Sequence, residues 1–489
     1  MERLPPSIYG TETEYGLSVV SGSREMQIAG SNTEHINPDA FALIELIADH
    51  IPEYLDSIDE MTTNGARVYG DHGHPEYSTP EIQTDTEYED TRSPNQIITA
   101  LDELIASEMA GERIVLDIFA DAIRAGHINE AELSRRLISD DGQSHGYHHN
   151  HLARSECMEP ALAIRDHLPE YTWLGLHLAT LSMYAGAGAI RGASFNTTTD
   201  PSFRFVTAQK ATALTKTFSP HTTGNDKPLV NLRTWRPYVE KEYSRVHVTS
   251  GDTGSPWSNK IQVGTTRLIV ASNEERIDDV PLPPVDPTTL YTFAGAVASD
   301  PSCKRAKLTL LDDRTINAPD VQYLQLERAQ ELRNRRELTT ADEWVMKEWE
   351  DALGKITRDP MQLVDRATWQ ARYQMLLHHA EKKGYGREGD AGFEPDWSHQ
   401  ALRQSDRIFD HVKSGKSVAG SYRATRWSAW MPPEWLIQER MTTPPAGRPA
   451  QRGRAIAKFK GRRGIASWDG IYFFDGGPRI ELRDHLGGI

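Results

Sequence analysis

Two glutamates stand two residues apart near the start of the chain, at Glu12 and Glu14, within the strand-like segment 8–20. Residues i and i+2 of a β-strand project from the same face, so the two carboxylates are expected to point the same way. Neighbouring carboxylates repel each other unless a divalent cation or a basic side chain compensates their charge. The pair therefore indicates a cation site, with a solvated strand face as the alternative.

A second group of chemically active residues lies in the segment NGARVYGDHGHPEYSTPE, residues 64–81. If the first part of this segment is a strand, Arg67, Tyr69 and Asp71 share one face. Glu76 adds a further carboxylate a few residues on. Mg²⁺ prefers oxygen ligands and commonly bridges carboxylates to substrate phosphates. Together with the first glutamate pair, the segment predicts a site for magnesium and a nucleotide phosphate; the alternative is a polar hairpin edge.

Four histidines cluster in the segment SHGYHHNHL, residues 144–152. Strand alternation would place His148 and Asn150 on one face. The opposite face would carry His145, Tyr147, His149 and His151. The segment contains no HExxH motif and no carboxylate at zinc-ligand spacing. We expect it to line a cleft without binding zinc, with a plain histidine-rich strand or a structural zinc site as alternatives.

Basic side chains recur in the β-like segment 231–252, at Arg233, Arg236, Arg245 and His247. Guanidinium groups on strands suit phosphate or carboxylate substrates. The alternative is ordinary surface pairing with Glu240 and Glu242. The chain contains no Walker A motif, no GxGxxG and no GxSxG turn, so a bound nucleotide is not expected to use a P-loop or a Rossmann turn.

These groups need a framework of strands and helices to position them. Residues 8–20 and 64–82 are strand-like, and residues 225–275 are rich in β-branched residues typical of strands. Residues 113–121 fit either a strand or a helix. Helical patterns are expected near residues 37–47, 93–109, 129–138, 318–353, 362–382 and 399–412, with loops at 278–302 and 384–398. The pattern predicts an α+β protein.

The amino-acid composition disfavours or excludes several classes of function. There are 54 Lys and Arg residues against 70 Asp and Glu residues, a formal net charge of −16, which disfavours nucleic acid and anionic membranes as partners. Two cysteines, Cys157 and Cys303, cannot build a disulfide scaffold or a cysteine zinc ribbon. The uncharged stretch Tyr171–Ile190 carries polar residues and favours a buried helix ending near Gly186 over a membrane span. With no apolar signal core at the N-terminus, we expect a cytoplasmic protein.

Several motifs, in this order along the chain, resemble one family. They are GTETEYG, NGARVYGDHGHPEYSTPE, GYHHNHL, NLRTWRP with RVHV and GD, VGTT, and ASWD at 466–469. The family is that of the Pup ligases and depupylases (proteasome accessory factor A and the deamidase of Pup), relatives of glutamine synthetase-type carboxylate–amine ligases. The resemblance implies an antiparallel β-sheet cradle backed by helices. It also implies a catalytic domain over residues 1–400 and a small C-terminal domain over 401–489.

The resemblance also implies roles for individual residues. Asp71 resembles the family's catalytic aspartate. The magnesium ligands would be Glu12, Tyr69 and Glu76. The contacts to ATP or ADP would be Arg67, Thr79 and, near the adenine, Trp468. Further candidate contacts to substrate or phosphate are Glu14, His148, Asn150, Arg233 and His247.

Some details favour the depupylase branch, and others depart from the family. GTE and DHGHPEY are more similar to the depupylases than to the ligases, which have GIE and DVGSHPEY. The K-N-N-x-D segment is absent, and NLRTWRP replaces NTRDEPH. The HEN triplet has become His148-His149-Asn150, Trp257 replaces a glutamate, and the interval between Gly16 and Asn64 is short for the depupylase loop.

The resemblance therefore predicts an ATP- and Mg²⁺-dependent enzyme acting on Pup, the prokaryotic ubiquitin-like protein, or on a Pup-like substrate and its conjugates. In the hydrolytic interpretation, Asp71 attacks, or activates water toward, a side-chain amide or isopeptide carbonyl. The alternatives are a Pup–protein ligase, in which an acyl phosphate is attacked by a lysine amine, a nucleotide-binding pseudoenzyme, and a small-molecule carboxylate–amine ligase. Neither nucleic acid nor a membrane is expected as a partner.

Overall fold

The computed structural model describes most of the chain. The described residues are 1–21, 24–27, 61–71, 74–94, 96–138, 144–158, 169–192, 203–222, 226–233, 242–389, 392–412, 417–459, 464–474 and 479–482. The helix expected at 37–47 and the candidate Arg236 lie outside the described residues.

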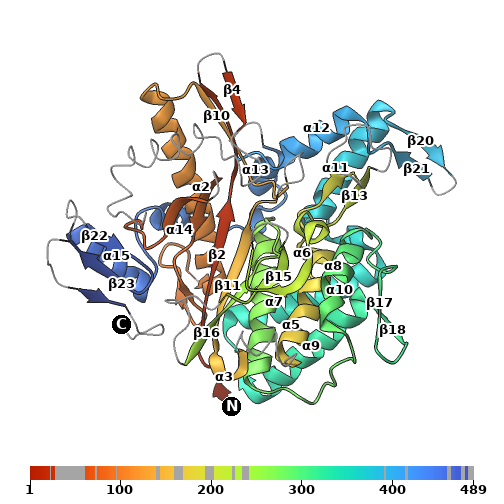
Figure 1. The fold of residues 1–489 in the computed structure, drawn as a ribbon, viewed down its shortest axis with the longest axis horizontal. Coiled ribbons are helices and arrows are strands. Elements are labelled where there is room, and N and C mark those ends of the chain that lie inside the picture. Colours follow the sequence, from red (N-terminus) through yellow and green to blue (C-terminus); the bar gives the residue numbers. More distant parts are fainter. Residues whose placement is uncertain are drawn as a thin grey trace.

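An eight-stranded sheet forms the centre of the molecule (Figure 1). Its strands, in spatial order, are β14 (Lys216–Ser219), β15 (Pro228–Asn231), β16 (Tyr243–Val248), β11 (Tyr147–Arg154), β2 (Ile8–Glu14), β6 (His74–Ser78) and β5 (Arg67–Asp71), with β7 (Ile82–Gln83) also pairing with β2. β14 and β15 are parallel, and every other neighbouring pair among these strands is antiparallel.

Strict alternation gives the middle of this sheet two different faces. In β11 and β16, every second residue is buried, and the residues between them are partly exposed. The buried set of β16 includes Val246 and Val248, which are fully inaccessible. Because successive strand residues point to opposite sides, the apolar set packs against helices and the polar set, including Arg245 and His247, shares the other face.

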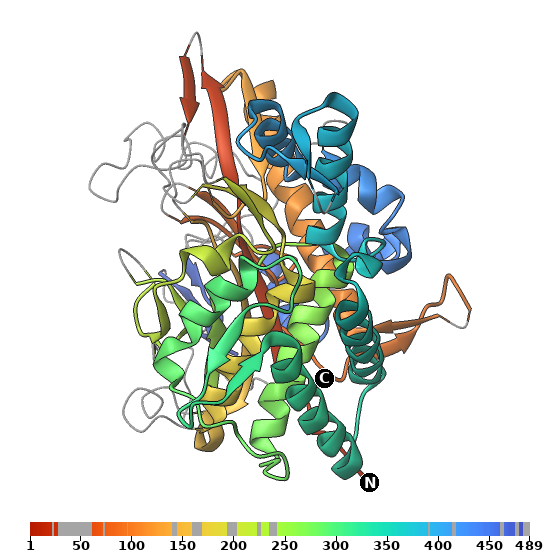
Figure 2. The same ribbon diagram turned by 90° about the vertical axis from the view of Figure 1, so that its right-hand side faces the viewer.

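Long helices cover the apolar face in layers (Figures 1 and 2). α2 (Ala100–Arg124) packs against β2 and β6, and α7 (Pro256–Glu274) packs against β11. α2 begins with a capping box, in which Thr99 and Asp102 satisfy each other's backbone N–H groups. Behind α7 lie α5 (Pro169–Thr180), α9 (Ala318–Arg335) and α10 (Thr340–Arg358).

Shorter elements surround this framework. The remaining strands are β1 (Glu2–Arg3), β3 (Gly16–Ser21), β4 (Arg24–Gln27), β8 (Glu87–Glu89), β9 (Ile97–Thr99), β10 (Glu130–Ser134), β12 (Ala189–Arg191), β13 (Arg204–Val206), β17 (Lys307–Thr309), β18 (Thr315–Asn317), β19 (Arg336–Glu337), β20 (Gly386–Gly389), β21 (Gly392–Pro395), β22 (Gly464–Ala466), β23 (Gly470–Phe473) and β24 (Ile480–Glu481). The remaining α-helices are α3 (Ser155–Met158), α6 (Ser182–Ala185), α8 (Leu290–Ala298), α11 (Thr368–Lys383), α12 (Gln400–Phe409), α13 (Val418–Ala424), α14 (Glu434–Arg440) and α15 (Arg448–Lys458).

The last part of the chain packs beside the sheet. α14 lies against α2, and α15 with the small β22–β23–β24 sheet encloses a separate apolar cluster of Met61, Ala455, Ile456, Ala466 and Ile471. Met61 forms an antiparallel bridge with Arg67, the first residue of β5, so this cluster joins the C-terminal elements to the central sheet. The division into domains at residue 400 stays a prediction.

The α+β class is confirmed, but several expected elements are wrong, among them the loop at 278–302, which contains α8. Residues 260–272, expected to be a strand, belong to α7, which begins after the capping residue Ser255 with Pro256 in its first turn. The β-branched side chains of this segment suggested a strand. The segment is buried on almost every side, and its tertiary packing overrides the local preference for a strand. Residues 129–138, expected to be helical, contain the strand β10, which pairs with β3.

The expectation for the uncharged stretch is confirmed, and that for the loop at 384–398 is wrong. The uncharged stretch Tyr171–Ile190 is a buried helical segment, and α6 ends at Ala185, directly before Gly186. In the part of the chain that is described, no helix combines the length and apolarity that crossing a bilayer requires. The expected loop at 384–398 instead contains the hairpin of β20 and β21.

Candidate active site

Three carboxylates from three adjacent strands converge on the polar face of the sheet. Glu14 of β2 stands directly opposite Glu76 of β6, and Asp71 lies at the end of β5. One oxygen from each of the three carboxylates lies within 4.8 Å of the others. We call Glu14, Asp71 and Glu76 the acidic group. The alternation of β2 and β5 predicted which face each side chain takes, and the strand pairing brings them together.

The acidic group is electrostatically unfavourable without a cation. Glu76 is only 2% exposed and accepts a hydrogen bond from the Tyr69 hydroxyl. Burial, and then the charges of Glu14, Glu12 and Asp71, hold the pKa of Glu76 well above its usual range. Burial beside Glu76 also raises the pKa of Tyr69, which therefore stays a hydrogen-bond donor. A bound divalent cation would offset these charges.

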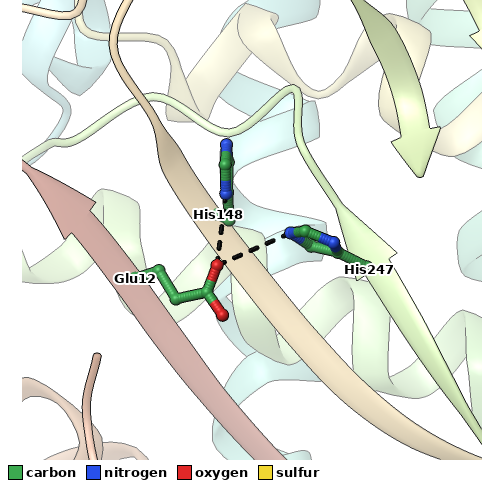
Figure 3. Close-up of side chains that lie close together, drawn as sticks. All are labelled: Glu12, His148 and His247. Atoms are coloured by element: carbon green, nitrogen blue, oxygen red, sulfur yellow. Dashed lines mark hydrogen bonds and ion pairs between the residues drawn. The ribbon is translucent and has the colours of Figure 1, made fainter. Parts of the chain in front are cut away.

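Glu12, two residues from Glu14, has a different environment. Its Oε1 accepts from Arg245 Nη2 at 2.6 Å, and its Oε2 lies 3.2 Å from His148 Nδ1 and 3.6 Å from His247 Nε2. Figure 3 shows both imidazoles directed at the carboxylate. Asn150 Nδ2 donates to Oε1 at 3.2 Å. We call these five residues the Glu12 group.

The partners of Glu12 outweigh the cost of its burial. Burial opposes ionisation, but Arg245, and then the nearby His148 and His247, hold the pKa of Glu12 well below its usual range. Burial, and then the charge of Arg245, lowers the pKa of His247 to about 3. At neutral pH, therefore, His247 is neutral and Glu12 is a carboxylate.

Both groups carry donors that suit a metal ion. The acidic group offers only oxygen atoms, the ligands that Mg²⁺ prefers. The carboxylate and two imidazoles of Glu12, His148 and His247 also meet within 4.8 Å. Of the predicted magnesium ligands, Glu76 lies in the acidic group, Tyr69 hydrogen-bonds to it, and Glu12 lies in the other group. The residues present therefore fit a divalent cation.

A pocket opens beside Glu12. It spans about 710 Å³ including its open mouth, and its lining includes Thr79, Asn150, Arg245, Arg448 and Trp468. Two predicted nucleotide contacts from opposite ends of the chain, Thr79 and Trp468, thus share one pocket. The Thr79 hydroxyl accepts from the Thr11 N–H at 2.9 Å.

Two predicted contacts lie apart from the pocket lining. The Arg67 guanidinium is 3.9 Å from the centroid of the Tyr69 ring, next to the acidic group. Arg233 follows β15 and is exposed, and its backbone N–H donates to Asn231 Oδ1. The role predicted for each stays a prediction.

The histidine-rich segment divides between the two faces as alternation predicted. His148 and Asn150 are partly exposed on the polar face, while His149 and His151 are buried behind the sheet, with their ring nitrogens 2.9 Å apart. Burial lowers the pKa of His151 to about 3. The prediction that the segment binds no zinc is untested.

Sequence reasoning missed two features of the site. Arg245 was one of several basic candidates, but its pairing with Glu12 joins residues 233 positions apart. Arg448 and Arg452 of α15 approach the pocket, where both interact with Glu81. Neither arginine lies in a motif, so no spacing signal pointed to them.

The central sheet thus carries clustered carboxylates and borders a pocket on one face. Comparison with known proteins identifies the protein family. A family described as "Pup-ligase protein" matches residues 7–472. The chain belongs to that family.

The curated relatives include both branches of the family. A depupylase of Acidothermus cellulolyticus is 27% identical over 95% of this chain and 90% of its own length. A Pup deamidase/depupylase of Mycolicibacterium smegmatis is 25% identical over 86% of this chain and 76% of its own. A Pup–protein ligase of Nocardioides sp. is 26% identical over 93% of this chain and 90% of its own length.

Solved structures share the fold. The ligase PafA in complex with Pup superposes with a TM-score of 0.77 at 20% identity, covering 100% of this chain and 91% of that one. PafA in complex with ADP gives a TM-score of 0.71 at 19% identity, over 96% and 94%. The predicted family and its fold are thereby confirmed.

Proposed function

We propose that this protein is a Mg²⁺- and nucleotide-dependent enzyme of the Pup system that hydrolyses a side-chain amide or isopeptide bond of Pup or its conjugates. The observation that carries the proposal is the position of Asp71 in the acidic group, on the same sheet face as Glu12, which lines the pocket with Thr79 and Trp468. The relatives named as depupylases support the hydrolytic reaction, and the fold shared with PafA supports a nucleotide at the sheet.

The cation would be held by Glu76, with Glu14 and Glu12 of the adjacent strand β2 as further carboxylates. When bound, the cation supplies positive charge that neutralises phosphate oxygens. Tyr69 holds Glu76 in place through its hydroxyl. Thr79 and Trp468 would contact the nucleotide, and Arg67 lies beside Tyr69, near the acidic group.

Asp71 would act on the carbonyl of the scissile amide. As a base it takes a proton from water, and as a nucleophile it attacks the carbonyl carbon directly; both require an ionised carboxylate fixed near the substrate. Arg245, His148, Asn150 and His247 face the same side of the sheet. They would bind the polar end of the substrate or a phosphate.

Two departures from the family motifs leave the polar face intact. The histidine that replaces the HEN glutamate, His149, is fully buried behind the sheet. Trp257, which replaces another glutamate, is also fully buried, and its Nε1 donates to Glu348 at 2.8 Å. Neither replaced position faces the acidic group, which favours a working enzyme over a pseudoenzyme.

Incubation with Mg-ATP or Mg-ADP and three forms of Pup tests the proposal. The substrates are Pup ending in glutamine, Pup ending in glutamate, and a Pup–lysine conjugate. Deamidation of the first or release of lysine from the third is the expected result. Conjugation of the second to a lysine would instead support the Pup–protein ligase, which the relative from Nocardioides sp. makes the second candidate. No turnover with nucleotide bound would support a pseudoenzyme.

A further inference from the structure

Trp468 lies on the turn between β22 and β23, and it lines the pocket from the C-terminal part of the chain. An indole can stack on a nucleobase only if its turn is held at a fixed distance from the sheet. Trp468 packs against the apolar cluster that contains Ala466 and Ile471, and polar contacts from a neighbouring helix fix the turn further.

Two arginines of α15 hold this turn. Arg452 Nη1 donates to the Trp468 carbonyl at 3.2 Å, and its guanidinium carbon lies 4.8 Å from the centroid of a Trp468 ring. Arg448 Nη2 donates to the same carbonyl. Both arginines are almost completely buried, at 4% exposure for Arg448 and 0% for Arg452. One carbonyl and one indole thus contact two desolvated guanidinium groups.

Glu81 ties both arginines to the sheet. Its Oε1 accepts from Arg452 Nη1 at 3.2 Å and lies 3.7 Å from Arg448 Nε. Glu81 stands between β6 and β7 and lines the same pocket. Buried charges are retained only when they are paired and hydrogen-bonded, so these three side chains depend on one another.

The same helix touches the backbone that leads into β5. Arg452 Nη2 donates to the Gly65 carbonyl at 2.7 Å. Gly65 has a positive φ of 80°, and a Cβ there would lie 2.8 Å from Pro449 Cβ. Only glycine fits this close approach. α15 is therefore fixed against the strands that carry Thr79 and Asp71.

We propose that Arg448, Arg452 and Glu81 form a clasp that positions Trp468 as the wall of the nucleobase end of the pocket. Binding of the base then depends on docking of α15 against the sheet, whereas the phosphate end depends on the sheet alone. This inference rests on the proposed function, in which the pocket takes a nucleotide. Arg452 is a positioning residue, since it acts through Trp468.

The test compares a ligand that has a base with one that lacks it. Calorimetry measures the binding of Mg-ADP and of Mg-tripolyphosphate to the wild type and to Arg452→Met. We expect Arg452→Met to weaken Mg-ADP about tenfold, the effect of losing one base–aromatic stack, and to leave tripolyphosphate binding within about twofold. Arg454→Met is the matched control, because Arg454 is exposed on the same helix.

A double variant separates positioning from folding. Arg452→Met alone leaves Glu81 with one partner fewer and lowers the melting temperature. Arg452→Met with Glu81→Gln also leaves the buried Arg448 without its carboxylate and should lower the melting temperature further, while Mg-ADP binding stays at the level of the single variant.

Equal loss of both ligands, unchanged Mg-ADP binding in Arg452→Met, or recovery of Mg-ADP binding in the double variant would overturn the clasp. A wild type that binds no Mg-ADP would instead overturn the proposed function.

Discussion

The acidic group and the Glu12 group occupy neighbouring parts of one sheet face, yet they have opposite electrostatics. Glu14 and Glu12 belong to the same strand and point the same way. Glu14 faces the carboxylate of Glu76, whereas Glu12 faces Arg245, His148 and His247. The pKa of Glu76 is consequently raised and that of Glu12 lowered. The partner strands, rather than the residue type, decide what each glutamate can do.

This difference suggests a division of labour. The acidic group concentrates negative charge that a cation can neutralise, and it contains the candidate base Asp71. The Glu12 group is already neutralised by protein side chains and presents Arg245 toward the pocket. The first arrangement suits metal binding and proton transfer, and the second suits recognition of an anionic or polar ligand.

Asp71→Asn should have the largest effect. Asparagine keeps the shape of the side chain but cannot accept a proton and is a much poorer nucleophile. General-base catalysis alone contributes about 10²–10⁴-fold, so turnover of the Pup substrate should fall by at least that factor while Mg-nucleotide affinity changes little. Single-turnover kinetics beside calorimetry would show both. Wild-type turnover in this variant would remove Asp71 from the mechanism.

Glutamine at Glu12 and at Glu76 should shift stability in opposite directions. Without a cation, Glu76→Gln removes a repelled buried charge and should raise the melting temperature. Glu12→Gln leaves Arg245 without its carboxylate and should lower stability by about 1–3 kcal/mol. Thermal melts in a chelator measure both.

Adding Mg²⁺ provides a second comparison, between the wild type and Glu76→Gln. It should raise the melting temperature of the wild type and have much less effect on Glu76→Gln. Shifts of the same sign for both variants in the chelator would show that the two groups do not differ as described.

Acidification should destabilise the Glu12 group. The pKa of His247 is about 3 in the folded protein, against ~6.5 for an unfolded histidine, so the unfolded state takes up the proton first. Below ~pH 6.5 this lowers the free energy of unfolding by up to about 1.4 kcal/mol per pH unit. For Glu76 the sign is reversed: its raised pKa means that the penalty of ionising it disappears as the pH falls.

Urea unfolding from about pH 7.5 to 5.5 measures this difference. Over this range the wild type should lose about 1.4 kcal/mol more stability than His247→Gln. Parallel curves for the two proteins would mean that His247 titrates normally.

Whether a feature of the site can be predicted from the sequence depends on how far apart its residues lie in the chain. Alternation over a few residues assigned Glu12, Glu14, Asp71 and His148 to their faces, because the two-residue period of a strand is local. The period could not reveal that Arg245 reaches Glu12, since β16 and β2 become neighbours only through β11.

The same reasoning explains one of the wrong elements. Local propensity favoured a strand over residues 260–272, where burial on all sides allows a helix to carry β-branched residues. The contacts of the clasp could not be predicted from the sequence either, because Arg452 and Glu81 are 371 positions apart.

Gly146 lies between the two groups and gives the smallest predicted effect. A Cβ at this position would collide with Glu14 Oε1 and lie 2.7 Å from His148 Nε2. Both atoms end flexible side chains, so Gly146→Ala should displace them at a stability cost of about 1 kcal/mol. The displacement moves one carboxylate of the acidic group and one imidazole of the Glu12 group at the same time.

Mg²⁺ affinity and nucleotide affinity then report on the two groups separately. If the acidic group holds the cation, Gly146→Ala should weaken Mg²⁺ severalfold in calorimetry with nucleotide present. Binding of metal-free nucleotide should change less, since Thr79 and Trp468 are untouched. Gly126→Ala is the control, because no atom lies within 4 Å of a Cβ built there, although its positive φ of 78° makes it a test of backbone strain alone. Unchanged Mg²⁺ affinity in Gly146→Ala would place the cation away from Glu14.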